Sequence, residues 1–546
     1  MDQAEPIDPI AVEILWTRLI SVIDEAALTL HRTSFSTVVR ESHDYTCMVL
    51  APDGQSVAQA TRSIPSFIGT LRVSVRAFLV KYPAETLRPG DVIISNDPWI
   101  GTGHLPDMTL AVPIFHGDTL VGFAGAVAHM ADIGGRRRAP DNKDIYEEGL
   151  QIPILKLYEA GSRNETLHEI IRQNVRVPDE VSGDIHAMVG ACQRMSTGLS
   201  GLLAEYAMAD MSGLASRIID LSEAAMRRAI AEIPDGIYTS VTKIDSFDSR
   251  MPLEMHCKME VRGAELTVDF AGSSPQNSSP LNSVLSYTRA YSTYALKCVL
   301  LPGVPNNEGN FRPITVTAPD GCFLNPSYPA AVEARATVGH YCTSAIFNTL
   351  AKALPDRVPA ESGMPLHGFA MSGWNGGRPF STILFFNGGQ GARPDLDGIS
   401  TLSFPTNVST TPVEVLERVV PVRIRDKSLL PGSGGMGKFR GGLGQRVVME
   451  ITSPRPVTLV VLSQRLNFPP LGRNCGENGS LERILLNDRE VEAGTPFQLK
   501  QGDNMTLELP GGGGFGPARE RTTKLREMDI EDGLLLPLFD GNTKQR

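Results

Sequence analysis

The glycine-rich segments constrain this chain more than any other feature of its sequence. Two of them, PGSGGMGKFRGGLG at 431–444 and LPGGGGFG at 509–516, are dominated by residues without a side chain. Glycine and proline together supply 91 of the 546 residues, against roughly 12% in an average protein. Because apolar runs surround most of these glycines, the excess indicates many turns and close backbone approaches, not disorder.

Neither segment has the residues of a nucleotide-binding loop. The first contains a Gly-Lys pair, but Phe439 stands where a phosphate loop requires Ser or Thr to hold Mg²⁺. The second lacks both lysine and hydroxyl, and neither has the spacing of a dinucleotide fingerprint. We therefore expect tight turns and close backbone packing in these segments, and no ATP site in this chain.

Charge and composition exclude several classes of partner. The chain has 51 basic and 61 acidic residues, a net charge of −10, which argues against nucleic acid and anionic membrane surfaces. No run approaches the roughly 20 apolar residues of a membrane span, and MDQAEPIDP lacks the features of a signal peptide. The seven cysteines form no CxxC motif, which is typical of buried free thiols in a reducing compartment. These features predict a soluble, cytoplasmic, multidomain protein.

Hydrophobic periodicity predicts an α+β chain of several subdomains. A mixed α/β region at 1–160 begins with a helix as far as about residue 33 and contains a strand at 119–130. A helical section follows at 161–235. A second mixed α/β region at 236–418 includes helices at 286–301 and 345–354. The last region, 419–546, alternates short strands with glycine clusters and is β-rich, as in a β-sandwich.

The densest group of polar residues lies in SNDPWIGTGHLPDM at 95–108 and AHMADIGG at 128–135. His104 and Asp107 are separated by Pro106 and so lie on a turn, while His129 and Asp132 repeat the spacing at the end of the predicted strand. Neighbouring strands could bring the two His-x-x-Asp pairs together. Two imidazoles with one or two carboxylates suit Mn²⁺, Fe²⁺ or Zn²⁺ and leave positions open for substrate.

Two further carboxylates could take part in such a metal site, and there is one alternative to it. Glu41 or Asp44, in RESHDYT, could add a ligand. The alternative is that the His-x-x-Asp spacing is accidental, since aspartates in turns commonly accept hydrogen bonds from backbone amides. The residues alone leave both interpretations open.

The sequence offers little support for a nucleophilic enzyme. It has no GxSxG motif; Cys47 near His43 and Cys342 near His340 are possible thiol–imidazole neighbours. For all seven cysteines a buried structural role is the stronger expectation. The basic run at 136–138 could bind an anionic substrate or phosphate, or form surface ion pairs or contact a partner.

Seven segments together resemble the hydantoinase B/oxoprolinase family. They are RESHDYTCMVLAPDGQ, SNDPWIGTGHLPDM, AHMADIGG, NNEGNFRPI, DFAGSSPQ, PGSGGMGKFRGGLG and LPGGGGFG, spread between residues 40 and 516. The family includes B subunits of ATP-dependent N-methylhydantoinases, oxoprolinases and caprolactamase-type lactamases. The family also includes the α subunits of acetone carboxylase and the related acetophenone carboxylase subunits.

The resemblance implies a set of site residues. A catalytic divalent metal (Zn, Mn or Fe) would be held by Glu41, His104, Asp107 and His129. Asp132 would orient one of the histidines. Arg136, with the two arginines after it, would suit a phosphorylated intermediate.

The resemblance also implies a division of labour. ATP and Mg²⁺ would be used on a separate actin-like A subunit, and this chain would be the metal-binding B subunit that opens a hydantoin, 5-oxoproline or lactam ring. Two alternatives remain: the α subunit of an ATP-dependent ketone carboxylase, and a non-catalytic scaffold. The length of 546 residues favours the amidohydrolase, because the carboxylase α subunits resemble longer chains.

Overall fold

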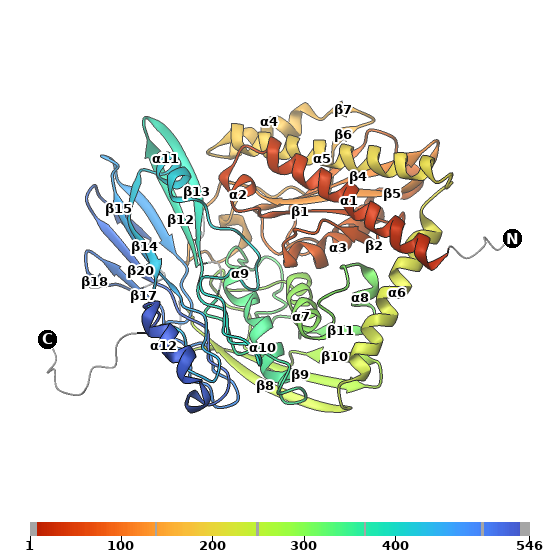
Figure 1. Ribbon diagram of the computed structural model, residues 1–546. Helices are drawn as coiled ribbons and strands as arrows, with labels where there is room; N and C mark the ends of the chain where they lie inside the picture. The colour runs from red at the N-terminus through yellow and green to blue at the C-terminus, as the bar shows by residue number, and fades with distance from the viewer. Residues whose placement is uncertain (1–7, 137–138, 247–250, 365–366, 493–495, 536–546) are drawn as a thin grey trace, which may run out of the picture.

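The computed structural model describes residues 8–136, 139–246, 251–364, 367–492 and 496–535. Within these ranges the strands form four sheets, with helices between and around them (Figure 1). This arrangement confirms the predicted α+β fold class with several subdomains.

The first sheet has seven strands in the order β2-β1-β5-β4-β3-β6-β7. Every neighbouring pair is antiparallel, and the long hairpin of β4 and β5 occupies the centre. The strands are β1 Tyr45–Leu50, β2 Ser56–Gln59, β3 Val92–Ser95, β4 Asp107–His116, β5 Thr119–His129, β6 Leu155–Glu159 and β7 Ser162–Arg163.

Helices cover both faces of this sheet (Figure 1). α1 (Pro9–Thr33) and α5 (Pro178–Glu205) pack on one face, and α3 (Pro65–Lys81) packs on the other. Successive side chains alternate between the two layers: Leu110 joins the core beneath α1 and α5, and Ala111 joins the core beneath α3. Burial on both faces explains why the central strands β1, β4 and β5 are buried along most of their length.

The predicted helical section consists of α4 (Glu165–Asn174), α5 and α6 (Ser212–Ala231). Local signals explain where these helices begin. The side chain of Asn164 accepts a hydrogen bond from the amide of Leu167, 3.1 Å away, at the start of α4. Pro178 occupies the first turn of α5, where its missing N–H costs nothing.

The second sheet has the order β11-β10-β9-β8, and only β10 and β11 run parallel. α10 packs on β8 and β9, and α7 packs on both α10 and α3, so α7 connects the first two units. The elements are β8 Gly236–Ile244, β9 Leu253–Arg262, β10 Glu265–Asp269, β11 Ile314–Thr317, α7 Leu285–Leu300, α8 Glu308–Phe311, α9 Arg335–Gly339 and α10 Tyr341–Leu350.

The C-terminal unit is a sandwich of two sheets around one apolar core. One sheet has the order β13-β12-β16-β19 and the other β14-β15-β20-β17-β18. The strands are β12 His367–Asn375, β13 Arg378–Phe386, β14 Val422–Leu429, β15 Gln445–Ile451, β16 Val457–Val461, β17 Arg483–Leu486, β18 Arg489–Glu490, β19 Phe497–Leu499 and β20 Asn504–Glu508. α2 (Thr37–Arg40), α11 (Val413–Val419) and α12 (Thr523–Glu531) complete the helices.

The sandwich extends further back along the chain than the predicted boundary at residue 419. β12 and β13 precede that boundary, yet β12 pairs with β16, and β13 pairs with β12 at the edge of the same sheet. Phe385 of β13 also reaches the core beneath the first sheet. The stretch between β13 and β14 is mostly loop and has no periodic pattern. The sequence alone therefore gives no signal that joins β12 and β13 to the strands after residue 419.

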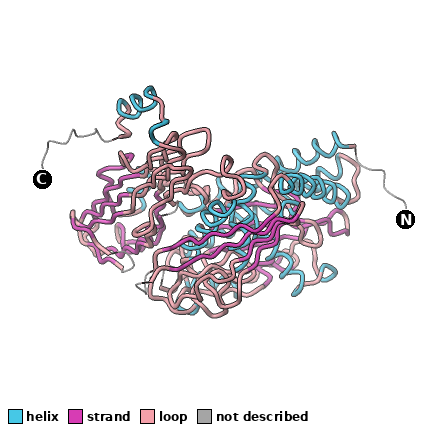
Figure 2. Tube along the Cα trace, turned by 90° about the horizontal axis from the view of Figure 1, so that it is seen from below, coloured by secondary structure: helices cyan, strands magenta, loops and turns pink. Residues whose placement is uncertain are grey.

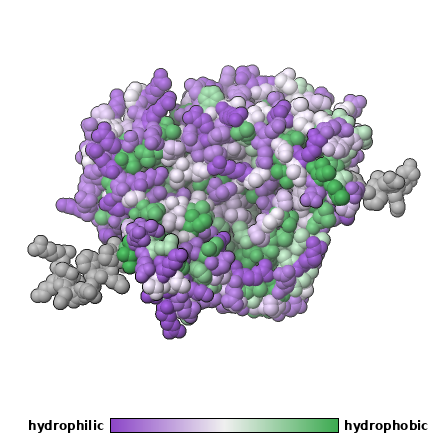
Figure 3. All heavy atoms as spheres, in the orientation of Figure 1, coloured by the Kyte–Doolittle hydropathy of each residue, from purple (hydrophilic) through white to green (hydrophobic). Residues whose placement is uncertain are grey.

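No described helix is both long and apolar enough to cross a membrane. On the face shown in Figure 3, hydrophilic residues cover most of the surface and hydrophobic residues occur in small groups. Such scattered exposed hydrophobic residues are normal for a folded chain.

The glycine-rich segments form a backbone lattice beside the sandwich. They are drawn as loop in Figure 2, and their amides pair between segments instead of within strands. Gly512 donates to the carbonyl of Gly442 (2.9 Å), Gly442 donates to that of Gln390 (2.8 Å), and Gly435 donates to that of Gly512 (2.8 Å). A Cβ atom on Gly512 would overlap the Gln390 carbonyl. Close backbone packing, as predicted, therefore accounts for these glycines.

Gly512→Ala is expected to destabilise the protein by more than about 3 kcal/mol, the upper end of a typical overpacking cost. The added methyl group meets backbone atoms, which cannot rotate away. Gly303→Ala is the control, because a Cβ atom there meets nothing within 4 Å. Denaturant unfolding of both variants measures the difference, and equal midpoints would contradict the lattice.

Candidate metal centre

The central hairpin brings three of the predicted ligands together. Asp107 is the first residue of β4 and pairs directly with His129, the last residue of β5. His104 lies three residues earlier, on the turn that leads into β4. These three residues form the group of His, Cys, Asp or Glu side chains in the described chain that could hold a metal ion.

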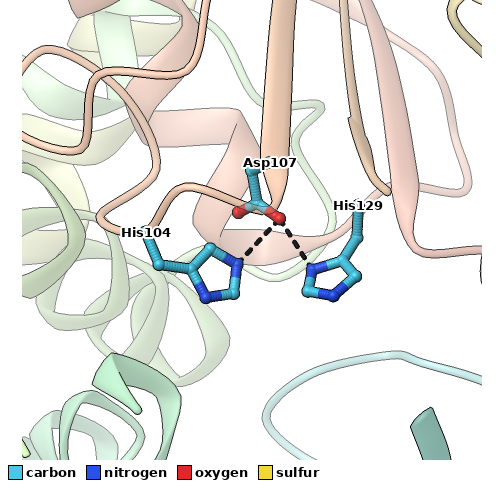
Figure 4. Close-up of side chains that lie close together, drawn as sticks. All are labelled: His104, Asp107 and His129. Carbon is cyan, nitrogen blue, oxygen red and sulfur yellow. Dashed lines mark hydrogen bonds and ion pairs between the residues drawn. The ribbon is translucent and has the colours of Figure 1, made fainter. Parts of the chain in front are cut away.

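The Asp107 carboxylate lies at the middle of this group (Figure 4). Its Oδ1 atom is 2.9 Å from His104 Nε2 and 2.9 Å from His129 Nδ1. Its Oδ2 atom accepts hydrogen bonds from the Thr102 hydroxyl and from the guanidinium group of Arg335. All three candidate ligands are at most 3% exposed, so their charges interact in a medium of low dielectric constant.

The tautomer of His104 provides a test of whether a cation fits here. Its Nδ1–H donates to the carbonyl of Glu333, 3.1 Å away, so in the neutral ring the Nε2 atom carries a lone pair. That atom is buried near the carboxylate of Asp107, and no described residue forms a hydrogen bond of normal geometry with it. A lone pair close to a carboxylate oxygen is repulsive unless a cation interacts with both, so the donor set fits a divalent metal.

The pKa shifts favour the protonation states that metal ligands require. Burial, together with the positive charge of Arg335, lowers the pKa of His104 to about 3. Burial alone would raise the pKa of Asp107, but His104 and Arg335 outweigh it and hold that pKa well below its ordinary value. Near neutral pH the site therefore presents a neutral imidazole and an ionised carboxylate.

A small cavity adjoins the candidate ligands. The centre of a water molecule can occupy about 20 Å³ of it, which is about the room that one or two waters need. Its walls come from the first sheet, α3, α7, α9 and the C-terminal unit. The lining residues are Asp44, Ile64, Ser66, Phe67, His104, His129, Tyr287, Tyr291, Arg335, Ala336, His340, Phe385, Thr406 and Val408.

The other two carboxylates expected at the site have different contacts. Glu41 lies at the end of α2, where its carboxylate pairs with Arg40 at 3.3 Å, outside the group formed by the three ligands. Asp132 is buried and accepts hydrogen bonds from the amide (2.6 Å) and guanidinium (2.7 Å) of Arg176. The Asp107 carboxylate contacts both histidines of the group, and Asp44 lines the cavity.

The basic run after the second histidine is only partly described. Arg136 is half exposed and pairs with Asp141 at 2.7 Å and with Glu147 at 3.3 Å. Residues 137 and 138 lie outside the described residues. The contacts of Arg136 are those of a surface ion-pair cluster, so its expected role toward an anionic intermediate stays a prediction.

Three residues of the cavity have no counterpart among the predicted ligands. Arg335 is buried against Asp107, and its guanidinium lies 4.3 Å from the centre of the Tyr287 ring. The hydroxyl of Tyr287 is 3.0 Å from His340 Nε2. One indirect signal in the sequence is the glycine before His104. Gly103 has φ of 93°, and a Cβ atom there would overlap Arg335.

The thiol–imidazole pairs are not activated nucleophiles. Burial raises the pKa of Cys47 to about 12 and that of Cys342 further still, so both thiols stay protonated. The ring of His43 stacks on His31 instead, with centroids 4.7 Å apart. All seven cysteines are free, as expected, but Cys298 is only partly buried and Cys475 is exposed, which corrects the expectation that each is buried.

The model of the hydantoinase B/oxoprolinase family matches residues 8–518. The chain belongs to this family. A protein from Pseudomonas sp. (strain NS671), proposed to be the B component of a D-/L-hydantoinase, is 30% identical over 97% of this chain and 93% of its own length. The beta subunit of caprolactamase from Pseudomonas jessenii is 29% identical over 97% of this chain and 94% of its own length.

Two solved structures have the same fold as this chain. The ATP-dependent caprolactamase from Pseudomonas jessenii superposes with a TM-score of 0.89 at 27% identity, covering 97% of this chain and 95% of that one. A nucleotide-free acetone carboxylase superposes with a TM-score of 0.88 over 97% of this chain and 78% of that one. Its identity is 18%, so this second match shows the fold alone.

The metal-free protein is expected to lose stability as the pH falls from 6.5 toward 3. In this window the unfolded chain protonates His104 near its ordinary pKa, while the folded chain protonates it only at about 3. The loss between pH 6.5 and 5 is about 2 kcal/mol. Urea unfolding of wild type and His104→Asn measures it; the variant should have the shallower pH dependence. His256→Asn, at an exposed histidine, is the control, and equal slopes for wild type and His104→Asn would contradict the expectation.

The stability of the Arg335→Met variant is expected to depend on bound metal more strongly than the stability of wild type does. Without the guanidinium group, the metal-free protein buries the Asp107 charge unpaired, which costs roughly 3–5 kcal/mol. A divalent cation restores a positive charge beside the carboxylate. Added Mn²⁺ or Zn²⁺ should thus raise the melting temperature more for this variant than for wild type. Arg176→Met breaks the ion pair of Asp132 instead and should show no extra response.

Proposed function

We propose that this chain is the metal-binding B subunit of an ATP-dependent amidohydrolase that opens a cyclic amide: a hydantoin, 5-oxoproline or a lactam. The observation that carries the proposal is the buried group of His104, Asp107 and His129 beside a small cavity. The family and the hydantoinase and caprolactamase relatives support the reaction class. The ATP-dependent caprolactamase supports the requirement for ATP.

The residues of the cavity fit hydrolysis of an inert carbonyl. A divalent Zn, Mn or Fe held by the three ligands would polarise that carbonyl and lower the pKa of water. Arg335, positively charged and buried at the same wall, suits the negative charge that develops on oxygen. Burial raises the pKa of the Tyr287 and Tyr291 hydroxyls, so both remain protonated and able to donate. Phe67 and Phe385 add apolar surface to the same cavity.

ATP use is assigned to a separate subunit. The glycine-rich segments, which come nearest to a phosphate loop in sequence, form a backbone lattice whose amides already pair with each other. The hydantoinase and caprolactamase relatives, which are themselves components of larger enzymes by name, support a hetero-oligomer. We propose an actin-like A subunit as the partner; it would activate the substrate before reaction at the candidate metal centre.

A ketone carboxylase is the second candidate, favoured by the fold shared with acetone carboxylase. The hydantoinase and caprolactamase relatives align over nearly their whole length, whereas 78% of the acetone carboxylase chain aligns. This difference supports the amidohydrolase. A non-catalytic scaffold is the third candidate, and the metal experiment below separates it from the other two.

Asp107→Asn and His129→Ala are each expected to remove the bound metal and to lower kcat at least about 100-fold, since both change ligand atoms directly. Metal analysis of the purified chain by mass spectrometry and steady-state kinetics with the partner measure both effects. His256→Ala, at the exposed face of β9, is the control and should change neither. Full activity without metal in the ligand variants would leave only the scaffold role.

The substrate class is tested by an ATPase screen of this chain with its A subunit. Hydantoin, 5-oxoproline, caprolactam and small ketones are each supplied with and without bicarbonate. We expect ATP hydrolysis stimulated by a cyclic amide, with release of the ring-opened acid and no need for bicarbonate. Ketone-stimulated turnover that fixes labelled bicarbonate would overturn the amidohydrolase in favour of the carboxylase.

A further inference from the structure

A buried carboxyl group outside the cavity holds the segment that completes the candidate metal centre. Glu148 follows the short 3₁₀ turn Ile145–Glu147 and is fully buried. Its Oε1 atom accepts hydrogen bonds from the amides of Val332, at 2.7 Å, and Glu333, at 2.8 Å. No described basic side chain forms an ion pair with it.

The same two segments are joined along their length. The amide of Ile145 donates to the carbonyl of Pro329, 2.9 Å away, and Asp144 forms an antiparallel bridge with Ala330. Residues 144–148 thus lie alongside residues 329–333. The Glu148 carboxyl group makes the last of these contacts, at the end closest in sequence to Arg335.

The segment held in this way contributes two groups to the metal centre. The carbonyl of Glu333 accepts the Nδ1–H of His104 and so selects the tautomer in which Nε2 is free to bind a cation. Two residues later, Arg335 pairs with Asp107. The two hydrogen bonds that Glu148 accepts therefore hold the segment that contacts His104 and that carries the arginine paired with Asp107.

Glu148 can hold this segment without a negative charge. Burial, reinforced by the nearby Glu333 carboxylate, raises the pKa of Glu148 well above its ordinary value. A protonated carboxyl group still accepts two amide hydrogens through its carbonyl oxygen. Glutamine offers the same acceptor at the same distance from the backbone, whereas alanine offers none.

We propose that Glu148 is a positioning residue: it fixes the backbone of residues 332–333 so that the carbonyl of Glu333 sets the tautomer of His104. The effect on metal affinity rests on the proposed function, but the effect on the tautomer does not. A readout in the metal-free protein can therefore separate the two.

The experiment compares Glu148→Ala and Glu148→Gln with wild type, using the full-length chain. Nitrogen-15 NMR of histidine-labelled, metal-free protein reports the tautomer, with the His104 signals identified by their loss in His104→Asn. Calorimetry with Mn²⁺ and Zn²⁺ gives the metal Kd. Glu482→Ala is the matched control, because Glu482 is also buried and accepts a hydrogen bond from a backbone amide, that of Gln464 at 3.1 Å.

We expect Glu148→Ala to populate both tautomers of His104 and to weaken metal binding about 10–100-fold, the usual effect of removing a supporting hydrogen bond. Glu148→Gln should match wild type in both readouts. Glu482→Ala should lose stability yet keep the wild-type tautomer and Kd. Should Glu148→Ala fail to fold, Glu148→Asp, whose carboxyl group is one methylene shorter, should show the same changes in smaller degree.

Two outcomes are kept apart by this design. A folded Glu148→Ala or Glu148→Asp protein with the wild-type tautomer overturns the positioning role, whatever the metal affinity. If wild type binds neither metal while the tautomer shifts as expected, the proposed metal function fails and the role of Glu148 stands.

Discussion

The buried negative charge of Asp107 is the constraint on which the candidate site depends. An ionised carboxylate in an apolar interior is tolerated only when hydrogen bonds and opposite charge compensate its lost hydration. Here a hydroxyl and a guanidinium group interact with one oxygen, and two imidazoles lie against the other. These partners come from the turn before β4, the end of β5 and the start of α9. Satisfying one charge therefore fixes three distant segments relative to one another.

Three of the four candidate ligands could be placed together from the sequence because their geometry is local. Pro106 places His104 and Asp107 on a turn, and the antiparallel register of one hairpin brings His129 opposite Asp107. Arg335 could not be found in this way. It is separated from its carboxylate partner by 228 positions, and only the packing of the second unit on the first brings the two together.

Elements of regular structure are easier to predict from this sequence than the boundaries between units. The positions of α1 and α7 agree closely with the helices that the sequence predicts. The boundary at 419 is misplaced because the stretch between β13 and β14 is mostly irregular backbone. The backbone lattice has no periodic signal either, since glycine contributes no side chain to a pattern. Its role follows from hydrogen bonds between segments that are far apart in the sequence.

The arrangement of the cavity walls has a consequence for how the molecule is made. Its lining runs from Asp44 to Val408, so a nascent chain on the ribosome already holds both histidines long before it holds the opposite wall. Contacts of such high sequence separation form late and slowly. The hairpin alone would expose its carboxylate to water and to any passing cation. The candidate site can therefore be complete only after the chain has been synthesised as far as residue 408 and the far wall has folded.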